Sequence, residues 1–207
     1  MNGVTIGFDL DMTLLDTTAG ITDTLRVLGA EEGVLIDTDD AVRSIGTPWH
    51  ELIRRWFPGG RAEHATHRFR ELYMEHGLEN QMPLPGAADA LDLVRRDGAR
   101  PIVVTARYEL TARACLERAG FDFGDDVTGS VFGPEKGAVL RAEGAVIYVG
   151  DTTSDVDGAH AAGARAVGVA TGPVTEAELA AAGADVVLSD LREFEPWWEV
   201  WRESGAG

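Results

Sequence analysis

The sequence predicts an α/β fold, in which a parallel β-sheet is covered by helices on both faces. Short apolar runs rich in β-branched residues recur along the chain, and segments of helical periodicity separate them, as expected for a parallel sheet. The predicted strands are residues 4–10, 101–106, 145–151, 164–170 and 184–190. The predicted helices among them are residues 87–97, 109–119, 138–143, 155–162 and 176–182. The alternation is interrupted once, directly after the first strand.

This interruption, residues 17–82, is expected to be a helical cap inserted into the α/β core. It contains no convincing strand, whereas helical periodicity occurs at residues 21–28, 39–45, 49–57 and 61–76. Pro83 and Pro85 stiffen the second border of the insert, because proline fixes its own φ angle. The predicted division is therefore a core of residues 1–16 and 83–207, and a cap of residues 17–82.

Composition and charge narrow the classes of function. The chain has 207 residues, of which 44% are hydrophobic, enough to bury a sizeable core. Its formal net charge is -17 at pH 7, so its surface repels nucleic acid and anionic membranes, and neither is an expected partner. An anionic substrate therefore needs local positive charge, supplied by a metal cation or by arginine.

The N-terminal sequence, the single cysteine and three tryptophans indicate the cellular compartment of the protein and the packing of its core. The opening MNGVTIGFDL lacks a basic region, and no apolar run approaches the roughly 20 residues of a membrane span, so we expect a cytoplasmic protein. The single cysteine, Cys115, excludes an internal disulfide and is expected to be a buried structural thiol. Near the C-terminus, Trp197, Trp198 and Trp201 are expected to pack a last helix onto the core.

Polar residues follow the predicted strands at one edge of the sheet. Ligands of open α/β sheets bind beyond the carboxyl ends of the strands. The first strand ends in DLDMT, which contains Asp9, Asp11 and Thr13. The residues after the later strands are Thr105, Ala106, Arg107, Asp151 and Asp155. We expect all of these side chains to converge at that edge.

The predicted cluster combines carboxylates with the only lysine of the chain. All other cations among the 18 Lys and Arg residues are arginine, and Lys136 falls just before the third of the predicted core strands. Clustered carboxylates repel one another unless a cation lies between them, and an all-oxygen set of ligands suits Mg²⁺. A threonine hydroxyl, free backbone amides and one lysine beside Mg²⁺ indicate a phosphate site.

At this point a resemblance to a known family becomes apparent. FDLDMTLLDT, VVTAR, the lysine and VGDTTSDVDGAHAAGA resemble, in this order, the four motifs of the haloacid dehalogenase superfamily. The resemblance covers nearly the whole chain and implies a Rossmann-like core with a helical C1-type cap. Within the superfamily the chain most resembles the phosphoglycolate-phosphatase-like hydrolases. One departure is that Lys136 is followed by Gly137, where many of those enzymes have proline, and lies only fifteen positions before Asp151.

The resemblance implies a phosphatase, a phosphoric monoester hydrolase, with assigned catalytic residues. Asp9 would be the nucleophile that forms an aspartyl-phosphate, and Asp11 the general acid and then the general base. Thr105 would donate a hydrogen bond to the phosphoryl oxygens, and Lys136 would offset negative charge. A covalent intermediate divides one difficult step into two, and phosphoryl transfer depends mainly on positioning and charge neutralisation.

The resemblance also implies a metal site and a substrate site. Mg²⁺ would be held by Asp9, the backbone carbonyl of Asp11, and Asp151, with Asp155 at or just behind the metal shell. Thr13 and Ala106 would support the loops around the phosphate.

Specificity in capped members comes from the cap, and here we expect Trp49 and His50, in the loop GTPWH, to face the substrate. Arg43, Arg54 and Arg55 are further candidates. The expected substrate is a small phosphorylated metabolite.

Alternative functions share these motifs in part. A dehalogenase would use the same nucleophile, but that branch lacks the second aspartate, here Asp11. A sugar phosphomutase would need an arginine in the cap loop for a second phosphate, whereas this loop carries Trp49. A non-enzymatic phospho-receiver also uses aspartate, Mg²⁺, threonine and lysine, but it has no helical insert. Neither the oligomeric state nor the identity of the substrate follows from the sequence.

Overall fold

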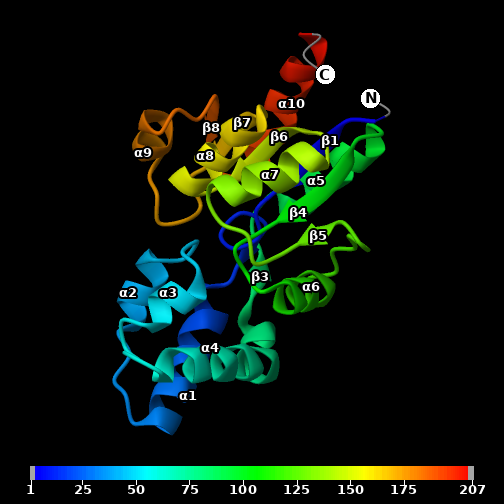
Figure 1. The fold of residues 1–207 in the computed structure, drawn as a ribbon. Helices are drawn as coiled ribbons and strands as arrows, with labels where there is room; N and C mark the ends of the chain where they lie inside the picture. The colour runs from blue at the N-terminus through cyan, green and yellow to red at the C-terminus, as the bar shows by residue number, and fades with distance from the viewer. Residues whose placement is uncertain (1–2, 205–207) are drawn as a thin grey trace.

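A six-stranded parallel sheet forms the core of the protein (Figure 1). The computed structural model describes residues 3–204. The strand order is β5-β4-β1-β6-β7-β8. The strands are β1 (Thr5–Phe8), β4 (Arg100–Val104), β5 (Val127–Thr128), β6 (Ala145–Gly150), β7 (Arg165–Val169) and β8 (Val186–Leu188). The predicted α/β fold with a parallel sheet is confirmed.

Five of these strands correspond to predicted apolar runs, although β4 begins one residue earlier than predicted, and β5 was missed. It has only two residues, pairs with β4 at the edge of the sheet, and lies in GDDVTGS, which is rich in turn-forming residues. The strands that were predicted are longer and almost wholly buried, as expected for a sheet covered on both faces.

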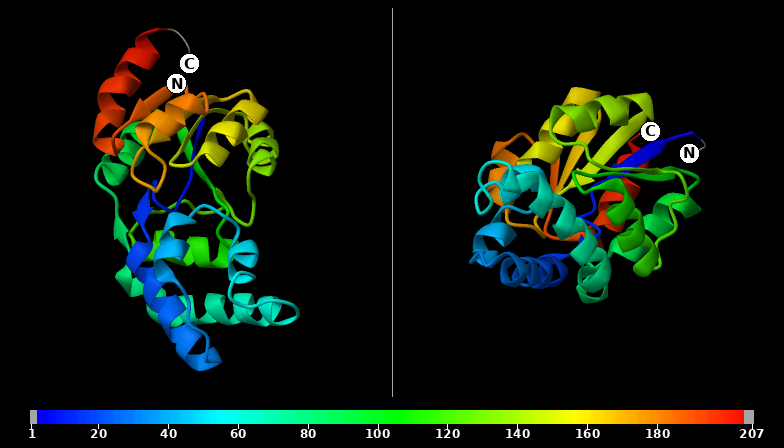
Figure 2. Two further views of the ribbon diagram at one scale, coloured as in Figure 1. Left: turned by 90° about the vertical axis from the view of Figure 1, so that its left-hand side faces the viewer. Right: turned by 60° about the horizontal axis from the view of Figure 1, so that its bottom comes forward.

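Helices cover both faces of the sheet, and alternate residues of β1 point to each face. Phe8 contacts Phe194 of α10 (Phe194–Glu203), with 6.0 Å between the ring centroids. A Cβ added at Gly7 would meet Leu140 of α7 (Pro134–Ala142), so Gly7 faces the other side. The α7 face also carries α8 (Thr153–Ala162) and α9 (Glu176–Ala181). The α10 face also carries α5 (Ala87–Arg96). Figure 2 shows the two layers on opposite sides of the sheet.

The cap lies below the carboxyl ends of the core strands in Figure 1. It comprises α1 (Thr18–Glu32), α2 (Thr38–Arg43), α3 (Trp49–Ile53), α4 (Arg61–Leu72) and the short helices η1 (Tyr73–Gly77) and η2 (Leu78–Asn80). Each predicted cap helix has a counterpart, although α1 is longer than expected and α3 is shorter. A core helix, α6 (Glu109–Arg118), contacts β5, η1 and η2.

A two-stranded antiparallel ribbon joins the cap to the core. β2 (Leu15–Asp16) pairs with β3 (Met82–Pro83), with Leu15 opposite Pro83 and Asp16 opposite Met82. The chain therefore enters and leaves the cap at adjacent points.

The remaining apolar features agree with their predictions. Trp198 and Trp201 are buried in the core, and the indole nitrogen of Trp198 donates a hydrogen bond to Asp97 at 2.7 Å. Cys115 is a buried free thiol. Among residues 3–204, no helix has both the length and the apolar character needed to cross a bilayer.

Candidate active site

Four elements of the core bring their polar side chains together beyond the sheet. Asp9 follows β1 and Asp151 follows β6, the neighbouring strand. Lys136 lies in the first turn of α7 and Asp155 in the first turn of α8. All four side chains are buried. The structure thus brings these four side chains together at one edge of the sheet.

Lys136 is the centre of this cluster. Its Nζ atom donates to Asp9 Oδ1 at 3.0 Å and to Asp155 Oδ1 at 2.6 Å. Burial alone would lower the pKa of Lys136, but the carboxylates of Asp155 and Asp9 outweigh it and hold the pKa well above its ordinary value. The side chain is therefore a charged ammonium at neutral pH.

Close packing of α7 and α8 positions this lysine. A Cβ at Gly137 would lie 2.6 Å from the Cβ of Ala161 and 2.8 Å from the carbonyl oxygen of Gly158. A larger residue would push the two helices apart. The glycine that departs from the pattern of the resembled enzymes therefore has a packing role here. Pro134 stands in the first turn of α7, where proline is favoured, so the helix begins earlier than the predicted residue 138.

Asp155 also belongs to the N-terminal cap of α8. Its Oδ2 atom accepts from the backbone N–H and the hydroxyl of Thr152, at 3.0 and 2.7 Å. The Thr152 hydroxyl oxygen in turn accepts from the Asp155 N–H, which completes a capping box. Its Oδ1 atom accepts from Lys136 and from the Tyr148 hydroxyl. Both carboxylate oxygens of Asp155 thus have protein partners.

Asp151 is different, because part of its carboxylate has no partner. Thr13 Oγ1 donates to Asp151 Oδ1 at 3.2 Å, but Asp151 Oδ2 is the one buried side-chain polar atom of residues 3–204 without a hydrogen bond. The loop over it is close enough that a Cβ at Gly172 would collide with this carboxylate. Burial, together with Asp155 and Asp9, raises the pKa of Asp151 well above its ordinary value.

Asp9, Asp151 and Asp155 form a carboxylate cluster that fits a divalent cation. One oxygen from each residue lies within 4.8 Å of the other two. Burial raises the pKa of Asp9 to about 7, despite the opposing charge of Lys136. Such repulsion, with an unsatisfied buried oxygen, is relieved when a cation binds between the carboxylates. An all-oxygen set of donors suits hard cations.

The side chain of Asp11 has a partner that the sequence did not reveal. Arg107 is buried, and its Nε atom donates to Asp11 Oδ1 at 3.1 Å and to Oδ2 at 3.0 Å. The Thr17 hydroxyl donates to Asp11 Oδ1 at 2.6 Å. The Arg107 guanidinium also lies over the ring of Tyr73 from the cap, at 4.4 Å. From the sequence, only the position of Arg107 after the predicted strand, in VVTAR, indicated that it lies near the site.

Burial alone would lower the pKa of Arg107, but the Asp11 carboxylate outweighs it and the pKa lies well above its ordinary value. Arg107 is therefore a permanent cation, and Asp11 is its carboxylate partner.

A small hollow connects this cluster with the cap. Asp9, Asp11, Thr105, Ala106 and Arg107 line it from the core, and Gly46, Thr47 and Trp49 are among its lining residues from the cap. Thr105 is buried there, and its hydroxyl oxygen accepts from the Arg107 N–H at 3.2 Å. The predicted site residues Thr105 and Ala106 therefore lie beside Asp9 and Asp11, under the cap loop.

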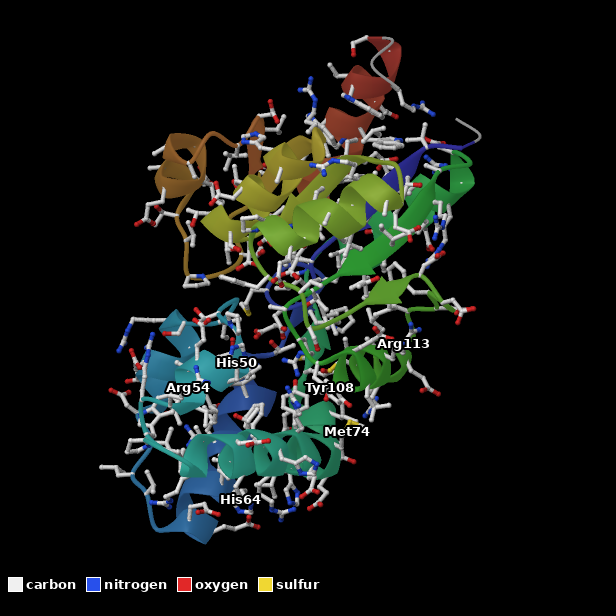
Figure 3. All side chains as sticks on the ribbon, viewed as in Figure 1. His50, Arg54, His64, Met74, Tyr108 and Arg113 are labelled. Carbon is white, nitrogen blue, oxygen red and sulfur yellow. The ribbon has the colours of Figure 1, made fainter. Side chains whose placement is uncertain are left out.

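A larger pocket of about 450 Å³ adjoins the hollow between cap and core. Trp49 and His50 line it from the cap, and Tyr108 and Ser130 line it from the core. Figure 3 labels His50 and Tyr108 near the level at which cap and core meet. Trp49 is half-buried and stacks on Phe69, with 4.4 Å between the ring centroids, so it also belongs to the packing of the cap.

The three candidate arginines of the cap do not line this pocket. Arg55 is paired with Asp40 at 2.8 Å, and Arg43 is exposed. Arg54 lines a separate groove on the cap together with His50 and Arg70. Arg70, which was not among the candidates predicted from the sequence, lines both the groove and the pocket.

Comparisons with known proteins agree with this geometry. Residues 4–163 match the family model of haloacid dehalogenase-like hydrolases. The chain is 28% identical to a phosphoglycolate phosphatase of Caulobacter vibrioides, over 91% of this chain and 87% of that protein. It is 31% identical to a phosphoglycolate phosphatase of Rhodospirillum rubrum, over 92% of this chain and 88% of that protein.

The fold is also similar to solved structures. A haloacid dehalogenase-like family hydrolase of Streptococcus pneumoniae superposes with a TM-score of 0.81, at 22% identity, over 94% of this chain and 98% of that chain. At this level of identity the likeness concerns the fold alone.

Proposed function

The chain belongs to the haloacid dehalogenase-like hydrolases and is a phosphatase, and we propose that it hydrolyses a small phosphorylated metabolite through an aspartyl-phosphate formed on Asp9. One observation carries the proposal. Asp9 lines the hollow together with Asp11 and Thr105, and its Oδ1 atom lies 3.0 Å from Nζ of Lys136, the only lysine of the chain. A nucleophile, its counter-charge and a proton carrier are thereby placed around one small space.

In the first half-reaction a carboxylate oxygen of Asp9 attacks phosphorus, and the bond to the leaving oxygen breaks. Asp11 enters this step as the protonated acid, gives its proton to this oxygen and is left as the carboxylate that pairs with Arg107. In the second half-reaction Asp11 takes a proton from water, which attacks the aspartyl-phosphate and releases phosphate. Lys136 donates to Asp9 and offsets the charge of the phosphoryl group, and Thr105 lies on the same wall. Arg107 and Thr17 fix the position of the Asp11 carboxylate.

We propose Mg²⁺ as the cation, with Asp9 and Asp151 as the side chains that hold it. Asp151 Oδ2 is free to take a ligand position, whereas both oxygens of Asp155 already accept hydrogen bonds. Asp155 would then stand behind the metal and position Lys136. The backbone carbonyl of Asp11 would complete the protein's share of the ligands. When bound, Mg²⁺ would supply positive charge that neutralises phosphoryl oxygens.

We also propose residues 17–82 as a cap that covers the substrate. The pocket between cap and core, with Trp49 and His50 on its wall, would hold the leaving group. The two phosphoglycolate phosphatase relatives make 2-phosphoglycolate the first substrate to test.

The proposal is tested by steady-state turnover and by trapping the intermediate. Purified protein with Mg²⁺ should hydrolyse p-nitrophenyl phosphate and one or more members of a phosphometabolite panel, and EDTA should abolish both activities. Acid quenching during turnover should leave phosphate on Asp9, located by mass spectrometry. A single phosphorylation without continued phosphate release, or phosphate on another residue, would contradict the proposed mechanism. Isomerisation of a sugar phosphate without net hydrolysis would instead indicate a phosphomutase.

A further inference from the structure

Among residues 3–204, Arg70 is a cation with no ion-pair partner, and it lies at the pocket between cap and core. It projects from α4, is half-buried and lines the pocket. Its guanidinium carbon lies 4.3 Å from the centroid of the Tyr108 ring, so a cap residue is stacked on a core residue. Within residues 3–204, Arg70 makes no ion pair or hydrogen bond through its side chain. The stacking holds the guanidinium in place but does not neutralise its charge.

Two neighbouring arginines that are buried or half-buried are neutralised, whereas Arg54, which is exposed, has no ion pair among the described residues. Arg68, also on α4, is paired with Glu31 at 2.8 Å and with Glu71 at 3.0 Å. Arg107, in the same pocket, is paired with Asp11. Acidic residues outnumber Lys and Arg by 35 to 18 in this chain, so carboxylates are available to pair with almost any arginine.

Two glutamates line the same pocket, yet they leave Arg70 free. Glu51 lies 3.9 Å from His50, and Glu135 is exposed. Neither is paired with Arg70. A half-buried cation is stabilised by an anion, and no carboxylate of residues 3–204 is paired with Arg70, so an anionic group of a ligand can take this place.

The pocket and the hollow share part of their walls, so a ligand bound at Asp9 would lead toward Arg70. Trp49, Ala106 and Arg107 line both spaces. A phosphomonoester with its phosphorus at Asp9 would therefore extend its leaving group past these residues into the pocket. The volume of about 450 Å³ lies in the range of pockets that bind small molecules, so there is space for a substituted leaving group.

From these observations we propose that the substrate is a phosphomonoester with a second anionic group on its leaving group, and that Arg70 binds this group. Tyr108 orients the guanidinium, which can donate two hydrogen bonds to a carboxylate or a second phosphate. Glu51 and Glu135 repel an anion elsewhere in the pocket and so direct it to Arg70. The inference rests on the proposed phosphatase function, and it identifies Arg70 as a specificity-determining residue.

The test compares substrates that differ only in the second anion. 2-Phosphoglycolate is matched with ethyl phosphate, and fructose 1,6-bisphosphate with fructose 6-phosphate. The first pair tests a carboxylate and the second pair tests a phosphate. The variants are Arg70→Gln and Arg70→Lys. Arg54→Gln is the control, because Arg54 is an exposed cap arginine that does not line the pocket.

The wild type should prefer the dianionic member of at least one pair. Arg70→Gln should raise KM for that substrate about 10- to 100-fold, the range expected for one charge-assisted contact, with kcat changed little. Its loss of kcat/KM for p-nitrophenyl phosphate should be about tenfold smaller than its loss for the dianionic substrate, and circular dichroism should show that the variant is folded. Arg70→Lys should recover part of the loss, and Arg54→Gln should resemble the wild type.

Other outcomes would overturn the inference. One such outcome is that the wild type hydrolyses p-nitrophenyl phosphate and shows no preference in either pair. Another is that Arg70→Gln impairs hydrolysis of both members of a pair equally. In both cases the phosphatase function would stand and the role of Arg70 would not. Failure of the wild type to hydrolyse any phosphomonoester would instead refute the proposed function itself.

Discussion

The active site has a floor, formed by residues of the core, and a roof, formed by residues of the cap. The two differ in how their side chains are held. On the floor, Asp9, Lys136 and Asp155 are buried and joined by short hydrogen bonds between core elements. On the roof, His50 and Arg70 are exposed or half-buried, and Arg70 has no polar partner among the described residues. A buried network whose members satisfy one another has one geometry, whereas an exposed side chain can adjust to what it binds.

The difference separates chemistry from selection of the substrate. Removing a member of the floor leaves a buried charge without its partner, so both activity and stability should respond. Removing a member of the roof exposes its partners to water, so the response should be confined to the choice of substrate. The predictions below test this contrast, in order of decreasing effect.

Asp9→Asn should reduce turnover by on the order of 10⁴-fold or more, because an amide does not attack phosphorus. The fold should be retained, as judged by circular dichroism, since the two side chains are nearly the same shape. Asp92→Asn is a matched control, because the Asp92 side chain is 83% exposed and lies on α5. Substantial residual activity in Asp9→Asn would rule out the covalent route.

Arg107→Met should lower the free energy of unfolding by about 3–5 kcal/mol, because it leaves the buried Asp11 carboxylate without its cation. Denaturant unfolding measures this loss. The double variant Asp11→Leu/Arg107→Met removes both charges and should recover part of the stability, although not the activity. Equal stability of the single and double variants would mean that the ion pair does not couple the two positions.

Lys136→Arg should lower kcat by about 10²- to 10³-fold, although the charge is kept. The ammonium is compact enough to lie between Asp9 and Asp155, whereas the planar guanidinium is wider and would displace one of them. Arg141→Lys, the reverse change on the exposed end of the same helix, is the control and should be neutral.

Because Lys136 is the only lysine, acetylation offers a second readout. Mg²⁺ with a phosphate analogue should protect it from modification. Full acetylation of Lys136 with unchanged turnover would remove it from the mechanism.

Mg²⁺ should raise the melting temperature more at pH 8 than at pH 5.5. The pKa of Asp9 is raised from 3.8 to about 7 in the folded protein, so the folded state retains a proton that the unfolded state loses. The free energy of unfolding of the metal-free protein therefore falls as pH rises from about 4 to 7. Asp151, whose pKa is also raised, changes stability in the same direction.

Bound Mg²⁺ offsets the repulsion between the charged carboxylates, and a saturating concentration should add about 5 °C or more at pH 8. Differential scanning calorimetry with Mg²⁺ and with EDTA at both pH values provides the measurement. An equal increase at the two pH values would contradict the raised pKa values.

Trp49→Ala should alter the ranking of substrates and lower stability only modestly. Its ring lines the pocket and stacks on Phe69, and such a pair contributes about 0.5–1.5 kcal/mol beyond the area that it buries. Phe69→Leu is the matched variant, because it removes the same stacking and leaves Trp49 in place. If both variants lose stability alike and keep the same ranking of a phosphometabolite panel, Trp49 belongs to the packing of the cap alone.

The sequence was most informative where function depends on local pattern. The strand ends that carry Asp9, Thr105 and Asp151 were predictable, because buried strands are apolar and their ends are not. The edge strand β5 was not, since two residues carry no periodicity.

Contacts between residues that are far apart in the sequence could not be predicted either. Arg107 meets Asp11 across 96 positions of sequence, and Arg70 meets Tyr108 from a different part of the fold. The sequence placed Arg107 at the edge of the sheet but not its pairing with Asp11, and nothing in the residues next to Arg70 distinguishes it from the other arginines of the chain, most of which are exposed.

The ribbon between cap and core makes the whole cap the loop of a β-hairpin. Its stem is the pairing of Leu15 with Pro83 and of Asp16 with Met82. A two-residue turn such as Asn-Gly, joining Asp16 directly to Met82, would close the same ladder. Replacing the cap by such a turn would give a smaller protein, in which the sheet and its carboxylates would remain and the active site would open directly to water.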